Sequence, residues 1–308
     1  MIPTQLQLLF LHELSREPIM IIFKNMLTNT VCLFTLLLGV NSCKQKADAP
    51  SYLRIENFSI KTNILTQGSA SQNITEAFVY IDDQIAGVYH LPALVPLTVT
   101  GSHSVKIGPA IIENAIASNI RVAYTFLGAY DTVLNFETNK SITLQPASSY
   151  RSTVKFELIE DFESPSLQFE KGPSNTLDTL IRDSLLSDNI EPGHCALFDM
   201  PNGFLMEYLT KSAYSLPSSS SSETFLEINY KSELALAIGL YVSGTPVTKT
   251  GVVTLNPKAT WSKAYINLTS VVSVKPPGTK FKLFISSLNL EGSNKKVFVD
   301  NLKIIHFE

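Results

Sequence analysis

The sequence has little cysteine and no excess of charge of one sign. Its 308 residues include three cysteines, 24 lysine and arginine residues, and 27 aspartate and glutamate residues. Because there is no basic excess to attract a phosphate backbone, the composition argues against nucleic acid as a partner. Histidine is scarce too, and none of the five histidines is spaced with another as a metal-binding pair.

The motifs of common enzyme classes are also missing. The chain has no Gly-x-Ser-x-Gly nucleophile turn, no phosphate-binding loop and no glycine-rich dinucleotide turn. His194 and Cys195 are neighbours, and on a strand neighbouring side chains point to opposite faces. We interpret Glu163, Glu207 and Glu227 as surface acids on strands rather than as a carboxylate pair for glycoside hydrolysis. The sequence therefore predicts a protein that is not an enzyme.

The first 42 residues are typical of an export leader. Lys24 precedes an apolar run from Met26 to Val40, and Asn41-Ser42-Cys43 follows it. The run is about 15 residues long, short of the ~20 that a membrane-spanning helix needs. The segment resembles a bacterial lipoprotein signal, which implies that the thiol of Cys43 is acylated. An ordinary secretory leader cleaved nearby is the alternative.

The other features of this region agree with export. Met20 fits the start of such a leader better than Met1, and residues 43–50 form a polar tether. Cys32 leaves with the leader and Cys43 takes the lipid, so Cys195 is the single cysteine of the folded part. We expect no internal disulfide there and a buried Cys195 thiol.

From Ser51 to the end, short apolar and polar alternations separated by turn residues indicate antiparallel β structure. The clearest hairpin joins 77–81 to 84–89, with Asp82 and Asp83 at its tip. Seven or more short strands up to residue 158 favour an immunoglobulin-like sandwich. In the polar segment that follows, the spacing of Leu177, Leu180, Ile181 and Leu185 predicts one or two helical turns.

The second half carries a family resemblance. Four pieces occur in order: Asp161–Glu163, Phe225–Lys231, Trp261–Leu268 and Val297–Ile304. Together they resemble the jelly-roll domains of galactose-binding-like proteins and carbohydrate-binding modules. The combination of a lipid anchor, a small sandwich and a jelly roll is similar to outer-membrane lipoproteins of Bacteroidota.

The resemblance implies a structural calcium ion between the first and last strands of the jelly roll. Glu163 and Asp300 occupy the matching places, with Asp161 as a third ligand. The alternative is that these acids are simply solvated. Glycan binding needs an exposed aromatic ring, for which Tyr208, Tyr214, Tyr230 and Tyr241 are candidates. Trp261 is expected to pack inside, and the sequence does not identify the ligand-binding residues.

The sequence thus predicts an all-β protein with a lipoprotein signal region (1–42), a tether (43–50), an immunoglobulin-like sandwich (51–158) and a jelly roll (159–308). We expect a lipid anchor in a bacterial outer membrane, facing the cell surface or the periplasm. The predicted function is non-catalytic binding, with polysaccharide recognised by the jelly roll. The alternative is a structural or assembly protein that contacts other envelope proteins and binds no small ligand.

Overall fold

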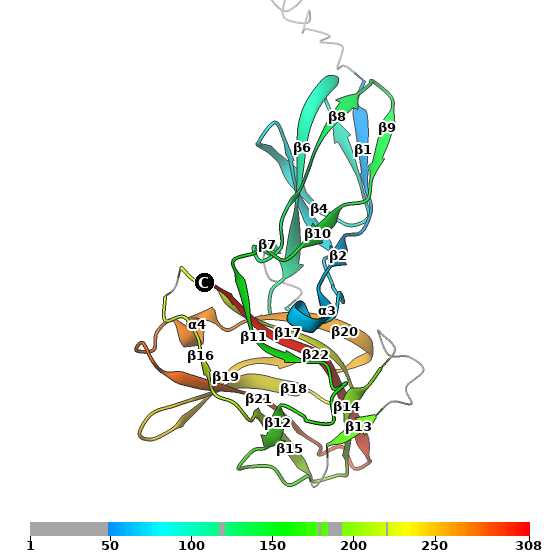
Figure 1. Ribbon diagram of the computed structural model, residues 1–308. Coiled ribbons are helices and arrows are strands. Elements are labelled where there is room, and N and C mark those ends of the chain that lie inside the picture. Colours follow the sequence, from blue (N-terminus) through cyan, green and yellow to red (C-terminus); the bar gives the residue numbers. More distant parts are fainter. Residues whose placement is uncertain (1–48, 117–120, 178–179, 184–192, 220) are drawn as a thin grey trace, which may run out of the picture. The chain divides into compact units, whose positions relative to one another are not determined.

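The computed structural model describes residues 49–116, 121–177, 180–183, 193–219 and 221–308 (Figure 1). The predicted leader and Cys43 lie outside these residues, as does all of the tether except residues 49 and 50. Ala49–Glu308 forms one compact unit. Among the described residues, no helix is long and apolar enough to cross a membrane.

The chain is all-β, as predicted. The strands of the N-terminal half form three sheets, ordered β4-β3-β6-β7 with β8 on β6, β5-β1-β9, and β10-β2. Two pairings, β1–β9 and β2–β10, are parallel and the others are antiparallel. The elements are β1 (Ser51–Ile55), β2 (Ser59–Lys61), α3 (Ile64–Gln67), β3 (Glu76–Ile81), β4 (Gln84–His90), β5 (Ala93–Leu97), β6 (Gly101–Ile112), β7 (Arg121–Ala123), β8 (Tyr130–Phe136), β9 (Ser141–Leu144) and β10 (Ala147–Ser149).

The predicted hairpin is confirmed. β3 and β4 pair in antiparallel fashion, and Asp82 and Asp83 at its tip have φ angles of 49° and 61°. Two left-handed residues in a row are what a two-residue hairpin turn needs, and aspartate tolerates that conformation. The immunoglobulin-like identity of this half stays a prediction.

The C-terminal half is a sandwich of two antiparallel sheets (Figure 1). We call them the β22 sheet (β13-β14-β22-β17-β20, with β11 on β22) and the β21 sheet (β12-β15-β21-β18-β19, with β16 on β21). The elements are β11 (Val154–Glu160), β12 (Phe169–Lys171), β13 (Ile181–Asp183), β14 (Cys195–Met200), β15 (Leu205–Thr210), β16 (Tyr214–Ser215), β17 (Thr224–Ser232), β18 (Leu236–Val242), β19 (Thr248–Leu255), β20 (Lys258–Asn267), α4 (Thr269–Val272), β21 (Lys280–Leu288) and β22 (Lys295–Phe307).

Alternation along the strands places the core between these two sheets. In β18, Leu236, Ile238, Leu240 and Val242 belong to one buried cluster that also takes alternate residues of β17 and β22. Each fully buried side chain of this size contributes about 1.5–3 kcal/mol. The residues between them, such as Ala237, Gly239 and Tyr241, therefore lie on the outer face of the β21 sheet.

Two sequence expectations need correction. The strand at 154–160, placed in the first sandwich, pairs with β22 and so belongs to the C-terminal sandwich. The boundary expected after residue 158 would cut through this strand, and it is better drawn before Val154. The helical turns expected around Ile181 are also wrong within the described residues, because Ile181–Asp183 is a strand at the edge of the β22 sheet. Backbone pairing with β14 satisfies its polar groups there.

The two halves share a buried aromatic cluster. Phe225, Tyr265 and Ile305, on the outer face of the β22 sheet, belong to the hydrophobic core of the N-terminal half. Phe126 stacks on Phe307 with ring centroids 4.7 Å apart. The N-terminal half therefore covers part of the outer face of the β22 sheet.

Candidate functional site

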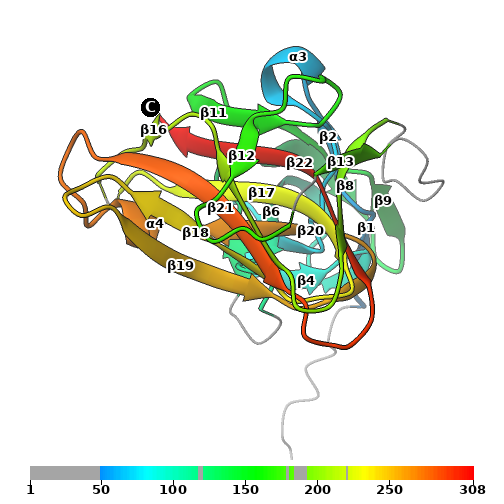
Figure 2. The same ribbon diagram turned by 90° about the horizontal axis from the view of Figure 1, so that it is seen from below.

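The outer face of the β21 sheet lies on the other side of the sandwich from the junction of the two halves, and Figure 2 looks onto its strands. None of its residues belongs to the hydrophobic cluster that joins the two halves. Leu209, Phe284, Gly239 and Gly251 form one row across four strands, as their pairings show. Two glycines in this row leave room above the sheet for neighbouring side chains.

Phe284 and Tyr241 use this room. A Cβ atom at Gly239 would lie 2.6 Å from the Phe284 ring and would also collide with the carbonyl of Thr250, so only glycine fits. Tyr241 is partly exposed and meets Phe284 edge-on, with centroids 5.7 Å apart and an interplanar angle of 78°. Edge-to-face contacts of this kind hold rings in fixed orientations.

A buried carboxylate fixes the other end of Tyr241. The Tyr241 hydroxyl donates to Glu207 Oε1 at 3.0 Å, and Lys249 forms an ion pair with Oε2. Glu207 is on β15, which is two strands away from β18, the strand of Tyr241. The tyrosine side chain therefore extends across the sheet toward β15. The main-chain N–H of Ser174 also donates to Oε1, and the Glu207 side chain is 0% exposed.

The electrostatics suit binding rather than acid catalysis. Burial alone would raise the pKa of Glu207, but its hydrogen bonds, above all that from Lys249, outweigh burial and lower it. Burial and the bond to Glu207 raise the pKa of Tyr241 to about 12. Glu207 is therefore ionised and Tyr241 neutral at pH 7. A general acid needs the opposite, a carboxyl group whose pKa is raised.

Polar groups surround the exposed part of this ring. The Lys249 ammonium lies 4.6 Å from the Phe284 centroid and 5.8 Å from that of Tyr241. Lys282, opposite Tyr241 on β21, pairs with Glu170 at 2.6 Å. The resulting surface, which we call the Tyr241 face, consists of the partly exposed Tyr241, Lys249, Lys282 and Glu170. The buried Phe284 and Glu207 contact Tyr241 and Lys249 from within the protein.

The four candidate tyrosines have different surroundings. Tyr208 and Tyr230 are buried in the core of the sandwich, and Tyr214 packs against it. Only Tyr241 lies on the Tyr241 face. Trp261 was expected inside, but it lies on the outer face of the β22 sheet beside Phe298, with centroids 6.3 Å apart. Trp261 shares its side of β20 with Lys263 and Tyr265, while Ala264 and Ile266 face the core.

Glu207 and Glu227 are not the surface acids that the sequence suggested. Glu227 is 1% exposed, and its Oε1 accepts hydrogen bonds from Tyr124 and Tyr150 at 2.6 Å each. Lys263 lies 2.5 Å from Oε2 as an ion partner, although the geometry of this contact is not that of a hydrogen bond. Because Tyr124 and Tyr150 come from the N-terminal half, Glu227 links the two halves.

A second lysine, Lys303, belongs to the same group of buried residues. We call this group, which consists of Glu227, Lys263, Lys303, Tyr124 and Tyr150, the junction network. The Lys303 ammonium donates to the Ser69 carbonyl at 2.6 Å and lies 3.4 Å from the Tyr150 hydroxyl. Burial alone would raise the pKa of Glu227, but the charges of Lys263 and Lys303 outweigh burial and lower it to about 2. A carboxylate so enclosed has a structural role, because its oxygens already have protein partners.

The residues predicted for calcium are bonded to other protein groups in this structure. Glu163 Oε1 accepts the main-chain N–H of His194 at 2.6 Å, and Arg182 donates to the carbonyls of Phe162 and Glu163 at 2.5 and 2.6 Å. The guanidinium thus holds the carbonyl oxygens that a cation would need.

Asp300, the second predicted ligand, is engaged as well. Its carboxylate accepts hydrogen bonds from the main-chain N–H and the side-chain amide of Asn301. Asp161 accepts a hydrogen bond from the main-chain N–H of Glu163. Over the described ranges, no three His, Cys, Asp or Glu residues gather as a metal site. Calcium binding stays a prediction without a supporting contact. Cys195 is buried, as predicted.

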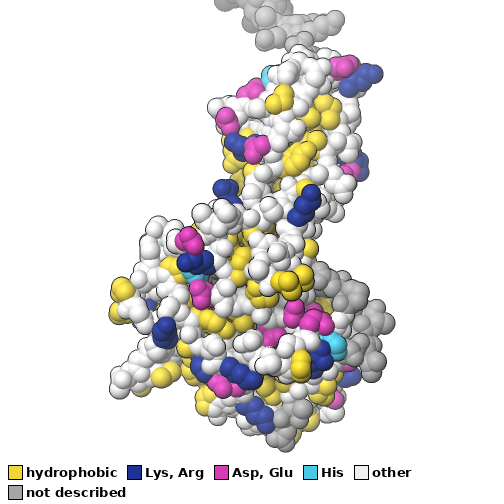
Figure 3. Space-filling view, in the orientation of Figure 1, with side chains coloured by type: hydrophobic (Ala, Val, Ile, Leu, Met, Phe, Trp, Pro, Cys, Tyr) yellow, Lys and Arg dark blue, Asp and Glu magenta, His cyan; other side chains and the backbone are white. Residues whose placement is uncertain are grey.

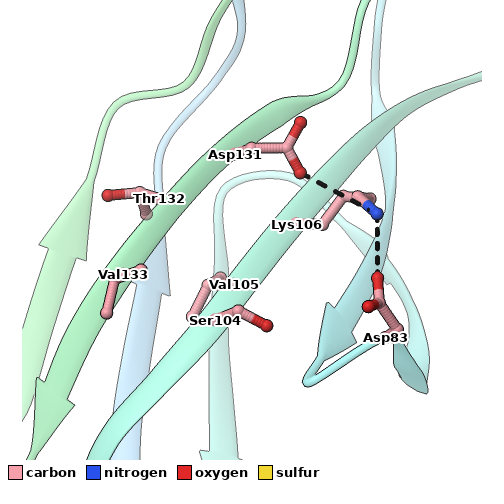
Figure 4. A pocket seen from close by; sticks show the side chains of 7 residues that line it. All are labelled: Asp83, Ser104, Val105, Lys106, Asp131, Thr132 and Val133. Carbon is pink, nitrogen blue, oxygen red and sulfur yellow. Dashed lines mark hydrogen bonds and ion pairs between the residues drawn. The ribbon is translucent and has the colours of Figure 1, made fainter.

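A shallow hollow of about 410 Å³ lies on the N-terminal half between the hairpin tip, β6 and β8 (Figure 4). Lys106 lies between two carboxylates there, 2.9 Å from Asp83 and 4.0 Å from Asp131. Both acids are largely exposed, at 80% and 62%. Exposed ion pairs of this kind contribute little to stability.

Comparisons with known proteins give structural likenesses only. No family model and no curated protein matches the chain. A family 61 carbohydrate-binding module in complex with β-1,4-galactotriose is 15% identical, with a TM-score of 0.33, covering 47% of this chain and 90% of that one. A family 29 carbohydrate-binding module is 13% identical, with a TM-score of 0.33, covering 50% and 88%.

A third structure, from a study of carbohydrate-binding modules of the β-sandwich superfamily, is 10% identical with a TM-score of 0.37 and covers 74% and 84%. The enzymatically active domain of a bacteriophage tailspike protein is also similar, at 9% identity and a TM-score of 0.36, covering 47% and 20%. The chain is thus similar in structure to β-sandwich carbohydrate-binding modules. Likenesses at these scores do not assign a function.

Proposed function

We propose that the protein is a non-catalytic binding protein that recognises a glycan through the Tyr241 face. The observation that carries the proposal is the partly exposed Tyr241 ring, which is held along the outer face of the β21 sheet by Glu207 and Phe284. A sugar ring can lay its C–H face on such an aromatic ring while its hydroxyl groups bond to polar side chains around it. Lys249, Lys282 and Glu170 stand at suitable places for those bonds.

The preorganisation of Tyr241 favours this proposal. A ring that is already fixed loses little conformational entropy on binding, so its contact energy is available for affinity. Glu207 is ionised and paired with Lys249, which agrees with positioning rather than catalysis. We further propose that Cys43 carries a lipid anchor that holds this face at a bacterial outer membrane, a proposal that is supported by the leader sequence alone.

The proposal is tested by measuring the affinity of the protein for a broad panel of neutral polysaccharides. Tyr241→Ala should weaken binding at least tenfold, which corresponds to 1.4 kcal/mol. Tyr241→Phe keeps the ring and should stay within a few-fold of the wild type. Tyr80→Ala, a partly exposed tyrosine on a sheet of the N-terminal half, is the matched control and should bind normally.

A second candidate function is docking to another envelope protein, as a structural or assembly component. It is favoured by exposed apolar residues on strands of the N-terminal half, where Ile85, Val88 and Val133 are 60%, 40% and 67% exposed. Figure 3 shows hydrophobic side chains reaching the surface of this half. The glycan proposal would be rejected if no glycan of the panel bound, or if Tyr241→Ala bound as tightly as the wild type. Docking to another envelope protein would then be the remaining candidate function.

A further inference from the structure

A second hollow lies on the other sheet of the C-terminal sandwich, where β17 ends and β20 and β22 begin. Figure 1 shows these three strands side by side. The hollow has a volume of about 250 Å³ and contains three lysines but only one carboxylate. Its lining residues are Lys231, Ser232, Glu233, Lys258, Ala259, Lys296 and Phe298.

The lysines concentrate positive charge in a chain whose formal net charge is −3. The Lys231 ammonium lies 5.6 Å from the Phe298 centroid, a cation–π contact that keeps it at the hollow. Lys258 and Lys296 are exposed, and neither has an ion-pair partner within the part of the chain that the structure describes. Their charges are therefore available to a ligand.

The one carboxylate braces the backbone of the hollow. Glu233 accepts the main-chain N–H of Lys296 at 2.8 Å, and its own N–H donates to the carbonyl of Lys296 at 3.0 Å. These two bonds tie the end of β17 to the start of β22. They hold Lys231 and Lys296, from two different strands, on the same hollow.

The lining also has an apolar component that a bare inorganic ion would not use. Ala259, the edge of Phe298 and the methylene groups of the lysines form the walls around the ammonium groups. A carboxylate attached to a carbon ring matches both parts, because its charge meets the ammonium groups while its carbon skeleton meets the walls. A sugar acid has this chemistry.

The hollow continues along β20. A neighbouring hollow of about 160 Å³ also includes Lys258 in its lining, together with Ser262, Lys263 and Tyr265 of the same strand. A polymer with a carboxylate on each unit can rebind at such a site, which strengthens contacts that are individually weak.

We propose that this lysine hollow is a second binding site, which takes the carboxylate of an acidic polysaccharide of the uronate class. It does not depend on the Tyr241 face, since the two sites lie on different sheets. The site gives the protein affinity for acidic glycan whether or not the Tyr241 face binds a neutral one.

The test uses polygalacturonate and its fully methyl-esterified form, which share a backbone and differ in charge. Wild-type protein should bind polygalacturonate at low ionic strength, bind the methyl ester at least tenfold more weakly, and lose affinity as salt is added. The variant Lys258→Ser/Lys296→Ser should lower affinity for polygalacturonate about tenfold. The control variant Lys61→Ser/Lys140→Ser removes the same charge at exposed positions elsewhere and should bind normally.

Three results would overturn the proposal: no binding of polygalacturonate, equal binding of the ester, or equal losses in the two lysine variants. The third would mean that net charge alone attracts the polymer. Because all four lysines are exposed, both variants should keep the wild-type melting temperature. Tyr241→Ala separates the two sites, as it should leave polygalacturonate binding intact even if no neutral glycan binds.

Discussion

Replacing Glu227 by glutamine tests how the two halves are held together. The change keeps the shape of the side chain and removes the negative charge that lowers the electrostatic energy of the buried Lys263 and Lys303. Lowering a pKa from 4.5 to about 2 is a shift of roughly 2.5 units, and at 1.36 kcal/mol per unit this corresponds to about 3 kcal/mol. Breaking a buried ion pair by removing one partner costs a similar ~3–5 kcal/mol.

We therefore expect Glu227→Gln to lower the free energy of unfolding by about 3 kcal/mol at pH 7. Chemical unfolding followed by circular dichroism measures this value. The matched control is Glu170→Gln, which breaks the partly exposed pair with Lys282 and should cost less than about 1 kcal/mol. Adding Lys263→Met to Glu227→Gln should recover part of the loss, because it removes the buried charge whose ion partner was Glu227.

The pH dependence gives an independent check. The pKa of Glu227 is lower in the folded protein than in the unfolded chain, so its contribution is complete above the unfolded value. It is lost as the pH falls from about 5 to about 2. The difference in stability between wild type and Glu227→Gln should shrink over that range. The reasoning would be refuted if the free energies of unfolding of wild type and Glu227→Gln differed by less than about 0.5 kcal/mol at pH 7. It would also be refuted if their difference did not change between pH 7 and pH 3.

Two further predictions concern the calcium prediction and the leader. EDTA should leave the melting temperature unchanged, since Arg182 bonds to the carbonyls of Phe162 and Glu163, whereas Arg182→Ala should lower the free energy of unfolding by about 2–3 kcal/mol. A drop in melting temperature in EDTA that added calcium reverses would contradict this. Cys43→Ser should abolish incorporation of labelled palmitate and release the protein from the membrane fraction in a bacterial host. Continued labelling of this variant would place the lipid elsewhere.

The longer strands could be predicted from the sequence because their alternation is regular and their turns are explicit. The hairpin at Asp82-Asp83 is one example, since both its strands and its turn follow from the sequence. Some short strands are harder to predict because edge positions relax the usual sequence rules. β5 contains Pro96, and it lies at the edge of the β5-β1-β9 sheet, where a residue without an N–H is tolerated.

The Tyr241 face was only partly foreseeable. Tyr241 was one of four candidate rings, and alternation along β18 could have placed it opposite Ile238 and Leu240. The partnership with Glu207 and Lys249 could not be predicted, because it joins β15 to β19 and depends on which strands become neighbours. Gly239 is a local clue, since a glycine within an apolar strand often marks the close approach of another group.

The junction network has a clearer signal in the sequence, although from the sequence we interpreted Glu227 as a surface acid. Glu227 stands between Leu226 and Ile228, and Lys303 between Leu302 and Ile304, so each of these two charges lies within a short apolar run. Such runs are typical of strands that are buried on both faces. A charge that is buried there needs a partner of opposite sign. β17 and β22 pair with Glu227 opposite Lys303. Strands that are buried on both faces also imply that another layer covers the outer face of the β22 sheet. The N-terminal half is that layer.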